Sequence, residues 1–218
     1  MKKQDEAVFS SYHLVIIFFM LAHLLFPAAA SASDTEQHIA KIQKAYENIK
    51  DLKGSFVQKS TIRDLDKTET YKGNFFIKPP LKMKWEYKGK TAQDITINND
   101  TVLIYKKGER QAYKSKFDRQ TYGQTPVALL GGFGNIKEEF SASAKDDSII
   151  LKPKKPMGSV TSIRIRISED AFPIRSFIIN DSYSNVIEIM ISDVKINTGL
   201  RDSLFDLSLP KEVNVFEQ

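Results

Sequence analysis

Hydrophobic and polar residues alternate with a period of two along most of the chain that follows Gly54. In segments 71–77 and 82–88, aromatic and aliphatic residues hold every second position and lysines hold many of the others. This alternation predicts β-strands with one dry face and one solvated face. Further strands are predicted at 95–97, 102–105, 111–114, 148–152, 163–167, 172–179 and 186–196. With the strand pattern that starts at Gly54, the count is about ten or eleven strands.

Short polar segments separate these strands, as at 98–100, 107–109 and 181–185. No helix-length crossover lies between consecutive strands, and parallel neighbours would need one. The predicted fold class is therefore mainly β, with a single curved antiparallel sheet that meanders.

A helix is predicted before the first strand. Residues 33–36 form a capping box, Ser-Asp-Thr-Glu, which typically begins a helix. Ile39, Ile42, Tyr46 and Ile49 then recur at spacings of three and four, and the helix is expected to end near 52–54.

A second, short helix is predicted within 125–132. Pro126 takes the favoured first position, and Gly131 and Gly132 follow its apolar residues Val127, Leu129 and Leu130. So short a helix is unstable alone and needs an apolar surface to lie on.

Residues 1–32 have the order of a secretory signal peptide: two lysines, an apolar run over 14–26, and the small residues of 28–32. The run would span about 20 Å as a helix, short of the roughly 30 Å hydrocarbon core of a membrane. Cleavage is predicted after Ala30 or Ala32, which leaves 33–218 as a single domain. Neither site is followed by the cysteine that an acyl anchor requires, so no permanent membrane anchor is expected.

Composition removes many kinds of chemistry. The chain has no cysteine, and of its three histidines only His38 lies outside the predicted leader, so disulfides, thiolate zinc sites and histidine-based triads are not expected. The acidic pairs at 138–139 and 146–147 and the basic segment 152–156 are interpreted as solvated loops. A net charge of +5 is too mild to predict nucleic-acid binding. No catalytic residue, metal site or cofactor is predicted.

The apolar face of the predicted sheet is either filled by its own side chains or encloses a ligand cavity, because barrels of this size are about where an interior begins to hold ligands. The pattern alone favours plain packing. If a cavity is present, alternation and the short helix assign these residues to its wall: Phe75, Ile77, Met83, Trp85, Tyr87, Ile95, Ile97, Val127, Leu129 and Leu130. The faces of 102–105 and 177–179 stay unassigned, since apolar residues occupy both parities.

The sequence resembles the periplasmic outer-membrane lipoprotein carriers of the LolA type. Segment 71–87, with a glycine-bearing strand, two prolines and a tryptophan-bearing strand, carries most of the likeness. Segments 56–58, 99–105, 125–130, 151–153 and 204–210 support it in order and spacing.

This resemblance implies a half-open β-barrel of about eleven strands with an α-helical lid. Its hydrophobic cavity would shield the acyl chains of lipoproteins in the periplasm. The implied partners are an inner-membrane ATP-driven exporter and an outer-membrane receptor, with the carrier itself a soluble monomer without cofactors. The family often has an arginine that latches the lid where this chain has Pro79, and Lys78 is expected to point to the opposite face.

Two other functions compete with this one. A lipid- or lipoprotein-sensing regulatory domain of the same architecture is the nearer alternative, although the sensors of this kind carry a second domain and about 186 residues leave little room for one. A secreted enzyme that uses carboxylates alone, such as a glycosidase, is the other, but no Asp or Glu stands out at a dry strand end.

Overall fold

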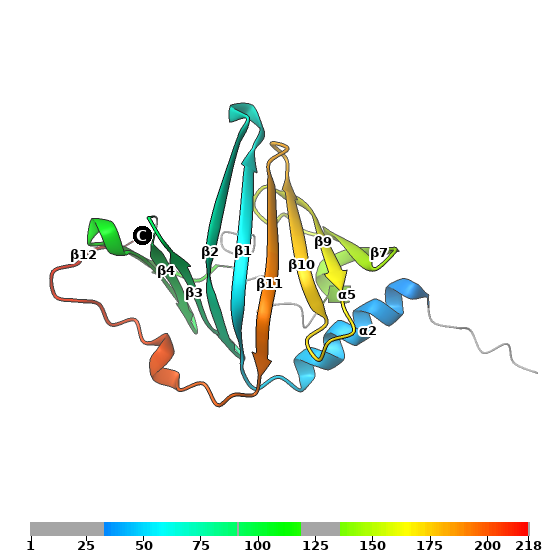
Figure 1. The fold of residues 1–218 in the computed structure, drawn as a ribbon, viewed down its shortest axis with the longest axis horizontal. Helices are drawn as coiled ribbons and strands as arrows, with labels where there is room; N and C mark the ends of the chain where they lie inside the picture. The colour runs from blue at the N-terminus through cyan, green and yellow to red at the C-terminus, as the bar shows by residue number, and fades with distance from the viewer. Residues whose placement is uncertain (1–32, 91, 119–135, 218) are drawn as a thin grey trace, which may run out of the picture. The chain divides into compact units, whose positions relative to one another are not determined.

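Twelve strands form one hydrogen-bonded sheet in the computed structural model, which describes residues 33–90, 92–118 and 136–217. Their order across the sheet is β12-β6-β5-β4-β3-β2-β1-β11-β10-β9-β8-β7, so the described sheet is open, with β12 and β7 at its edges (Figure 1). The strands are β1 (Leu52–Ile62), β2 (Lys67–Lys78), β3 (Lys82–Lys88), β4 (Gln93–Asn98), β5 (Thr101–Lys106), β6 (Gln111–Lys116), β7 (Phe140–Lys145), β8 (Ser148–Pro153), β9 (Val160–Ile167), β10 (Ile174–Asp181), β11 (Val186–Ile196) and β12 (Asn214–Glu217).

Strands β1 to β11 pair antiparallel, which confirms the predicted mainly β, half-open architecture. They form two meanders, β1–β6 and β7–β11, joined where β1 pairs with β11. The twelfth strand departs from the prediction, because β12 pairs with β6 in the parallel sense. Its four residues are all exposed, so no buried alternation marks them in the sequence.

Register places the apolar residues of neighbouring strands on the same side of the sheet. Leu52, Ile77, Met83, Ile97 and Val102 are successive partners across β1 to β5, and all are buried. We call this side the apolar face and the other side the opposite face. Burial of one face explains why the strands keep a strict alternation, since a slip of one residue would turn every apolar side chain to water.

The helix α2 (Asp34–Glu47) begins as predicted, because the Ser33 hydroxyl accepts a hydrogen bond from the amide of Glu36 at 3.3 Å. Its buried residues Ile39 and Ile42 join the core beside β7 and β8. The Thr35 hydroxyl also accepts a hydrogen bond from the Ala144 amide of β7 at 2.8 Å. Thus α2 covers the β7–β8 part of the apolar face.

The end of α2 differs from the prediction, which placed it near 52–54. The helix stops at Glu47, and the Asn48 side chain donates to the carbonyl of Lys44. Leu52 instead begins β1, where it pairs with both Ile77 and Ile196. Pairing with two strands therefore overrides the helical spacing of the apolar residues.

Strand β10 also begins later than predicted, at Ile174 instead of residue 172. Pro173 lacks the amide that a strand interior needs, and its carbonyl accepts from the amide of Ser168 in a bend. Three one-turn helices complete the described part: η2 (Arg63–Leu65), η3 (Lys107–Glu109) and η5 (Asp202–Phe205), with the short α5 (Ile136–Glu139) before β7. The predicted helix within 125–132 lies outside the described residues.

Residues 197–217, here called the C-terminal strap, run from the end of β11 to the sheet edge at β6 (Figure 1). Asp51 anchors the beginning of the strap. Its buried carboxylate accepts hydrogen bonds from the amides of Thr198, Gly199 and Leu200 and from the Thr198 hydroxyl, at 2.7 to 3.2 Å. Burial alone would raise the pKa of Asp51, but these hydrogen bonds outweigh burial and lower the pKa.

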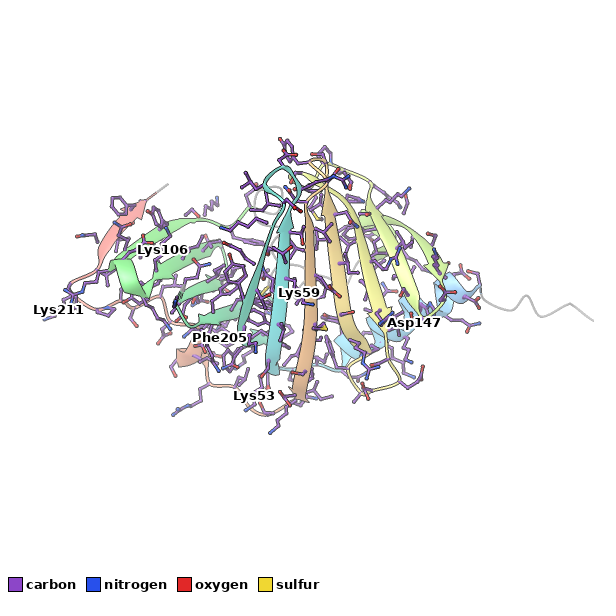
Figure 2. All side chains as sticks on the ribbon, turned by 45° about the horizontal axis from the view of Figure 1, so that its top comes forward. Lys53, Lys59, Lys106, Asp147, Phe205 and Lys211 are labelled. Atoms are coloured by element: carbon purple, nitrogen blue, oxygen red, sulfur yellow. The ribbon has the colours of Figure 1, made fainter. Side chains whose placement is uncertain are left out.

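Further along the strap, Asp202 forms ion pairs with Lys78 at 2.5 Å and Lys82 at 3.0 Å. These lysines lie on the opposite face, as expected for Lys78, which also donates to the Leu200 carbonyl. Phe205, labelled in Figure 2, is fully buried in η5, which packs against β3 and β4. The strap therefore covers part of the opposite face.

We expect Asp51→Asn to destabilise the protein by about 1–3 kcal/mol at pH 7, because an amide cannot accept all four hydrogen bonds. A carboxyl whose pKa is lowered by folding stabilises above its unfolded pKa, near 3.9, and loses this contribution as the pH falls through its folded pKa. Urea unfolding of both proteins from pH 7 to pH 3 should show the difference shrinking towards acid. The exposed Glu212→Gln serves as the control, and a pH-independent difference would contradict the role of the Asp51 charge.

Candidate functional site

An aromatic cluster occupies the centre of the apolar face where β1, β2 and β3 lie side by side. The Trp85 ring stacks on Phe56 with 4.0 Å between centroids and on Phe75 with 5.7 Å. Tyr87 meets the edge of Phe56 at 5.3 Å, and Tyr71 meets Tyr87 at 5.8 Å. The cluster is a continuous, largely buried apolar layer built from three adjacent strands.

Gly73 makes this stacking possible. It is the register partner of both Phe56 and Tyr87, so it lies beneath the cluster in the middle strand. A Cβ atom at Gly73 would lie 1.9 Å from the Glu86 carbonyl oxygen and 2.5 Å from Cε1 of Phe56. Only glycine leaves room here for the Phe56 ring to lie flat over β2 and reach Trp85.

The structure brings together seven of the predicted site residues on the apolar face. Trp85 pairs in register with Phe75 and Ile95, and Met83 pairs with Ile77 and Ile97. Phe75, Ile77, Met83, Trp85, Tyr87 and Ile97 are buried, while Ile95 is partly buried against the same core. The other three, Val127, Leu129 and Leu130, lie outside the described residues. Contact of any of these side chains with an acyl chain stays a prediction.

The inward-facing residues of the apolar face change from apolar to polar towards one end of the strands. Beyond Phe56, the next inward position of β1 is Gln58, which is only 7% exposed, and after it comes Ser60. The Tyr87 hydroxyl donates to Oε1 of Gln58 at 2.9 Å, and Nε2 of Gln58 donates to the Ser60 hydroxyl at 3.0 Å. Burial raises the pKa of Tyr87 to about 12, so its hydroxyl keeps its proton at neutral pH.

A cavity of about 660 Å³ opens at this polar end. Its wall combines inward positions of β1 to β5 with the loops beside them: Gln58, Ser60, Tyr71, Tyr87, Lys90, Ala92, Gln93, Lys106, Gly108 and Glu109. Figure 2 labels Lys106 on β5 and Lys59 on β1, which belong to opposite sides of the sheet by register. Lys106 pairs with Glu109 at 3.3 Å and lies 5.6 Å from the Tyr113 ring centroid, whereas Lys90 has no ion pair among the described residues.

The described residues contain no group of three or more His, Asp or Glu side chains placed to hold a metal ion. Within the same residues, no helix has both the length and the apolar character needed to cross a membrane. What the described site offers is an apolar surface with hydrogen-bonding groups at one end.

Phe56, Gln58 and Tyr71 also belong to the site, although they are not among the residues predicted from the sequence. All three occupy inward positions of their strands: a period of two counted from Leu52 reaches Phe56 and Gln58, and one counted back from Phe75 reaches Tyr71. The unassigned positions are also resolved by register: Val102, Phe177 and Ile179 belong to the apolar face, and Leu103 and Ile178 to the opposite face. Leu103 is buried although it lies outside the main core, on the face that the strap crosses.

Residues 47–208 match the family model of the outer membrane lipoprotein carrier protein LolA. An outer-membrane lipoprotein carrier protein of Neisseria meningitidis serogroup C is 29% identical over 169 residues, covering 75% of this chain and 79% of that protein. A protein of the same name from Chromobacterium violaceum is 26% identical over 204 residues, covering 91% and 97%. The crystal structure of an uncharacterised conserved protein from Thermus thermophilus superposes with a TM-score of 0.54 at 12% identity, covering 84% of this chain and 98% of that one, which shows a shared fold.

We expect Gly73→Ala to lower the free energy of unfolding by about 3 kcal/mol, because overpacking of this size forces the Phe56 ring or β3 to move. The emission of Trp85, the one tryptophan of the chain, should change with it, since Phe56 stacks on its ring. Gly108→Ala is the matched control, because a Cβ there meets nothing within 4 Å. Equal stability of the two variants would show that Gly73 does not shape the cluster.

Proposed function

The chain belongs to the LolA family of outer membrane lipoprotein carriers, and we propose on this basis that it carries lipoproteins across the periplasm by covering their acyl chains with the apolar face. It would receive them from an inner-membrane ATP-driven exporter and deliver them to an outer-membrane receptor. The observation that carries the proposal is the apolar face itself, where apolar register partners follow one another from β1 to β5 on a sheet whose described edges do not close.

This surface suits a carrier because burial of an acyl chain is favourable by about 0.8 kcal/mol per methylene. A lipid-anchored protein therefore does not cross water unaided at a useful rate. Contacts with Phe, Ile, Met and Trp side chains are non-directional, so a receptor surface of the same kind can compete for the chains. Release then needs no bond to be broken, and the proposed function includes no catalytic step, metal or cofactor.

We expect the purified protein to bind a diacylglyceryl-cysteinyl peptide with an uncharged tail and to keep it soluble. The same peptide without acyl chains should not bind, because the attraction scales with apolar area. The buried Trp85 should report binding through its fluorescence, and affinity should differ little between low and high salt. Equal binding of the deacylated peptide would contradict the proposal.

Two isoleucines offer a matched pair of variants on the two sides of the sheet. Ile95 is partly buried on the apolar face, and Ile178 is partly buried on the opposite face of β10. If the apolar face holds the chains, Ile95→Asn should weaken lipopeptide binding at least several-fold, while Ile178→Asn should leave it unchanged. Thermal unfolding of both variants separates lost binding from lost folding.

We also propose that residues 1–30 or 1–32 are removed during export, which would release the carrier into the periplasm without an anchor. Intact-mass measurement of the periplasmic protein should then give a chain that begins at Ser31 or Ser33 with no added lipid. An uncleaved or acylated N-terminus would contradict this prediction.

A further inference from the structure

We propose that the cavity at the polar end of the apolar face binds the ester groups of the diacylglyceryl head, while the aromatic cluster beside it receives the chains. This inference rests on the proposed function and adds to it a place for the polar part of the lipid. It identifies Gln58 and Ser60 as residues that favour binding of an ester-linked chain over binding of an apolar chain of equal length without the ester.

Residues along the apolar face follow the same order as the parts of a diacylglyceryl lipid. Leu52 and Phe56 of β1 are followed by Gln58 and Ser60, and Ile77 and Phe75 of β2 lead to Tyr71. On β4 and β5 the same direction leads from Ile97 and Val102 to Gln93 and Lys106. These four strands thus change from apolar to polar at the same end, as a diacylglycerol does from its chain ends to its head.

Gln58 is a buried amide whose hydrogen bonds are not all satisfied within the fold. An amide taken from water into an apolar environment costs free energy unless its hydrogen bonds are satisfied. Gln58 accepts from Tyr87 and donates to Ser60, but its Nε2 carries a second hydrogen for which the described residues provide no acceptor. The Ser60 hydroxyl, which accepts from Gln58, keeps its own hydrogen for another group.

Trp85, two residues before Tyr87, also carries a buried donor. The Nε1 atom of Trp85 is buried and makes no hydrogen bond of ordinary geometry with the described residues, although it approaches the Tyr87 hydroxyl closely enough to oppose the rise in the pKa of Tyr87. At the junction between the aromatic cluster and the cavity, donor hydrogens of Trp85, Gln58 and Ser60 therefore have no acceptor of ordinary geometry among the described residues. A ligand that supplies acceptor oxygens there would satisfy them.

The charges around the cavity favour uncharged acceptors over a phosphate. Lys106 is paired with Glu109, and the hydroxyl of Tyr71 is bonded to Glu69, which also pairs with Lys67. Among the described residues of the wall, only Lys90, which is exposed, adds an unpaired positive charge. Ester carbonyls accept hydrogen bonds without charge, and they lie where the acyl chains meet the glycerol, at the same boundary as Gln58.

The test compares two lipopeptides that differ only in how the chains are attached. One has two ester-linked chains, and the other has ether-linked chains of the same length, which lack the carbonyl oxygens. We expect the wild-type protein to bind the ester form about 3- to 10-fold more tightly, the range for one or two hydrogen bonds.

Two variants test whether Gln58 and Ser60 cause the preference for the ester. Gln58→Met keeps the length of the side chain and should bring the ester-to-ether ratio close to one without weakening the ether ligand. Ser60→Ala, at a half-buried position that leaves the Tyr87–Gln58 hydrogen bond in place, should lower the ratio partially. Ser176→Ala on the opposite face of β10 is the control and should keep the wild-type ratio.

The outcomes separate this inference from the proposed function. Equal affinities for both lipopeptides in the wild type, or an unchanged ratio in both variants, would overturn the ester site while leaving the carrier function intact. Failure of the wild type to bind either lipopeptide would contradict the proposed function itself. Because Gln58→Met removes the partner of Tyr87, its unfolding midpoint is measured beside the ratio, and Ser60→Ala decides the question if Gln58→Met does not fold.

Discussion

Burial of one face of a sheet that does not close on itself underlies the other features of this structure. Closure of a barrel leaves no unpaired edge strand and encloses the interior at the same time. Here the described edges are β12 and β7, and the apolar face needs other cover. Helix α2 supplies this cover over β7 and β8. Over β1 to β5, burial of the apolar face is achieved by large side chains that pack on one another from neighbouring strands. The constraint that stabilises the fold therefore also creates the apolar face on which the proposed function rests.

The aromatic cluster and the polar cavity are two ends of one surface, and both depend on details of β1 and β2. Gly73 gives Phe56 the space to stack on Trp85, and two residues after Phe56 the buried Gln58 begins the hydrogen-bonded group with Tyr87 and Ser60. Tyr87 belongs to both, because its ring packs in the cluster and its hydroxyl reaches Gln58. A lipid with apolar chains and an oxygen-rich head matches this arrangement better than a purely apolar ligand does.

The opposite face is not simply solvated. The C-terminal strap is fixed at its start by Asp51, along its length by Lys78 and Lys82 through Asp202, and at its end by pairing of β12 with β6. It brings Phe205 onto β3 and β4, and on the same face the buried Leu103 of β5 pairs in register with Thr96 of β4. The strap therefore protects an edge strand and a second, smaller apolar region while leaving the apolar face to its own role.

The amino-acid sequence alone predicted the antiparallel meander, the start of α2 and the face on which residues such as Phe75, Met83 and Trp85 lie, because alternation and capping are local signals that burial enforces. It did not determine where α2 ends, since Leu52 is recruited into β1 by partners at Ile77 and Ile196 that are distant in sequence. Nor could it assign 102–105, because Leu103 becomes buried on a face crossed by a strap about a hundred residues later, or predict β12, whose exposed residues have no pattern. Contacts of this kind are decided by which distant segments meet, and only the tertiary structure brings them together.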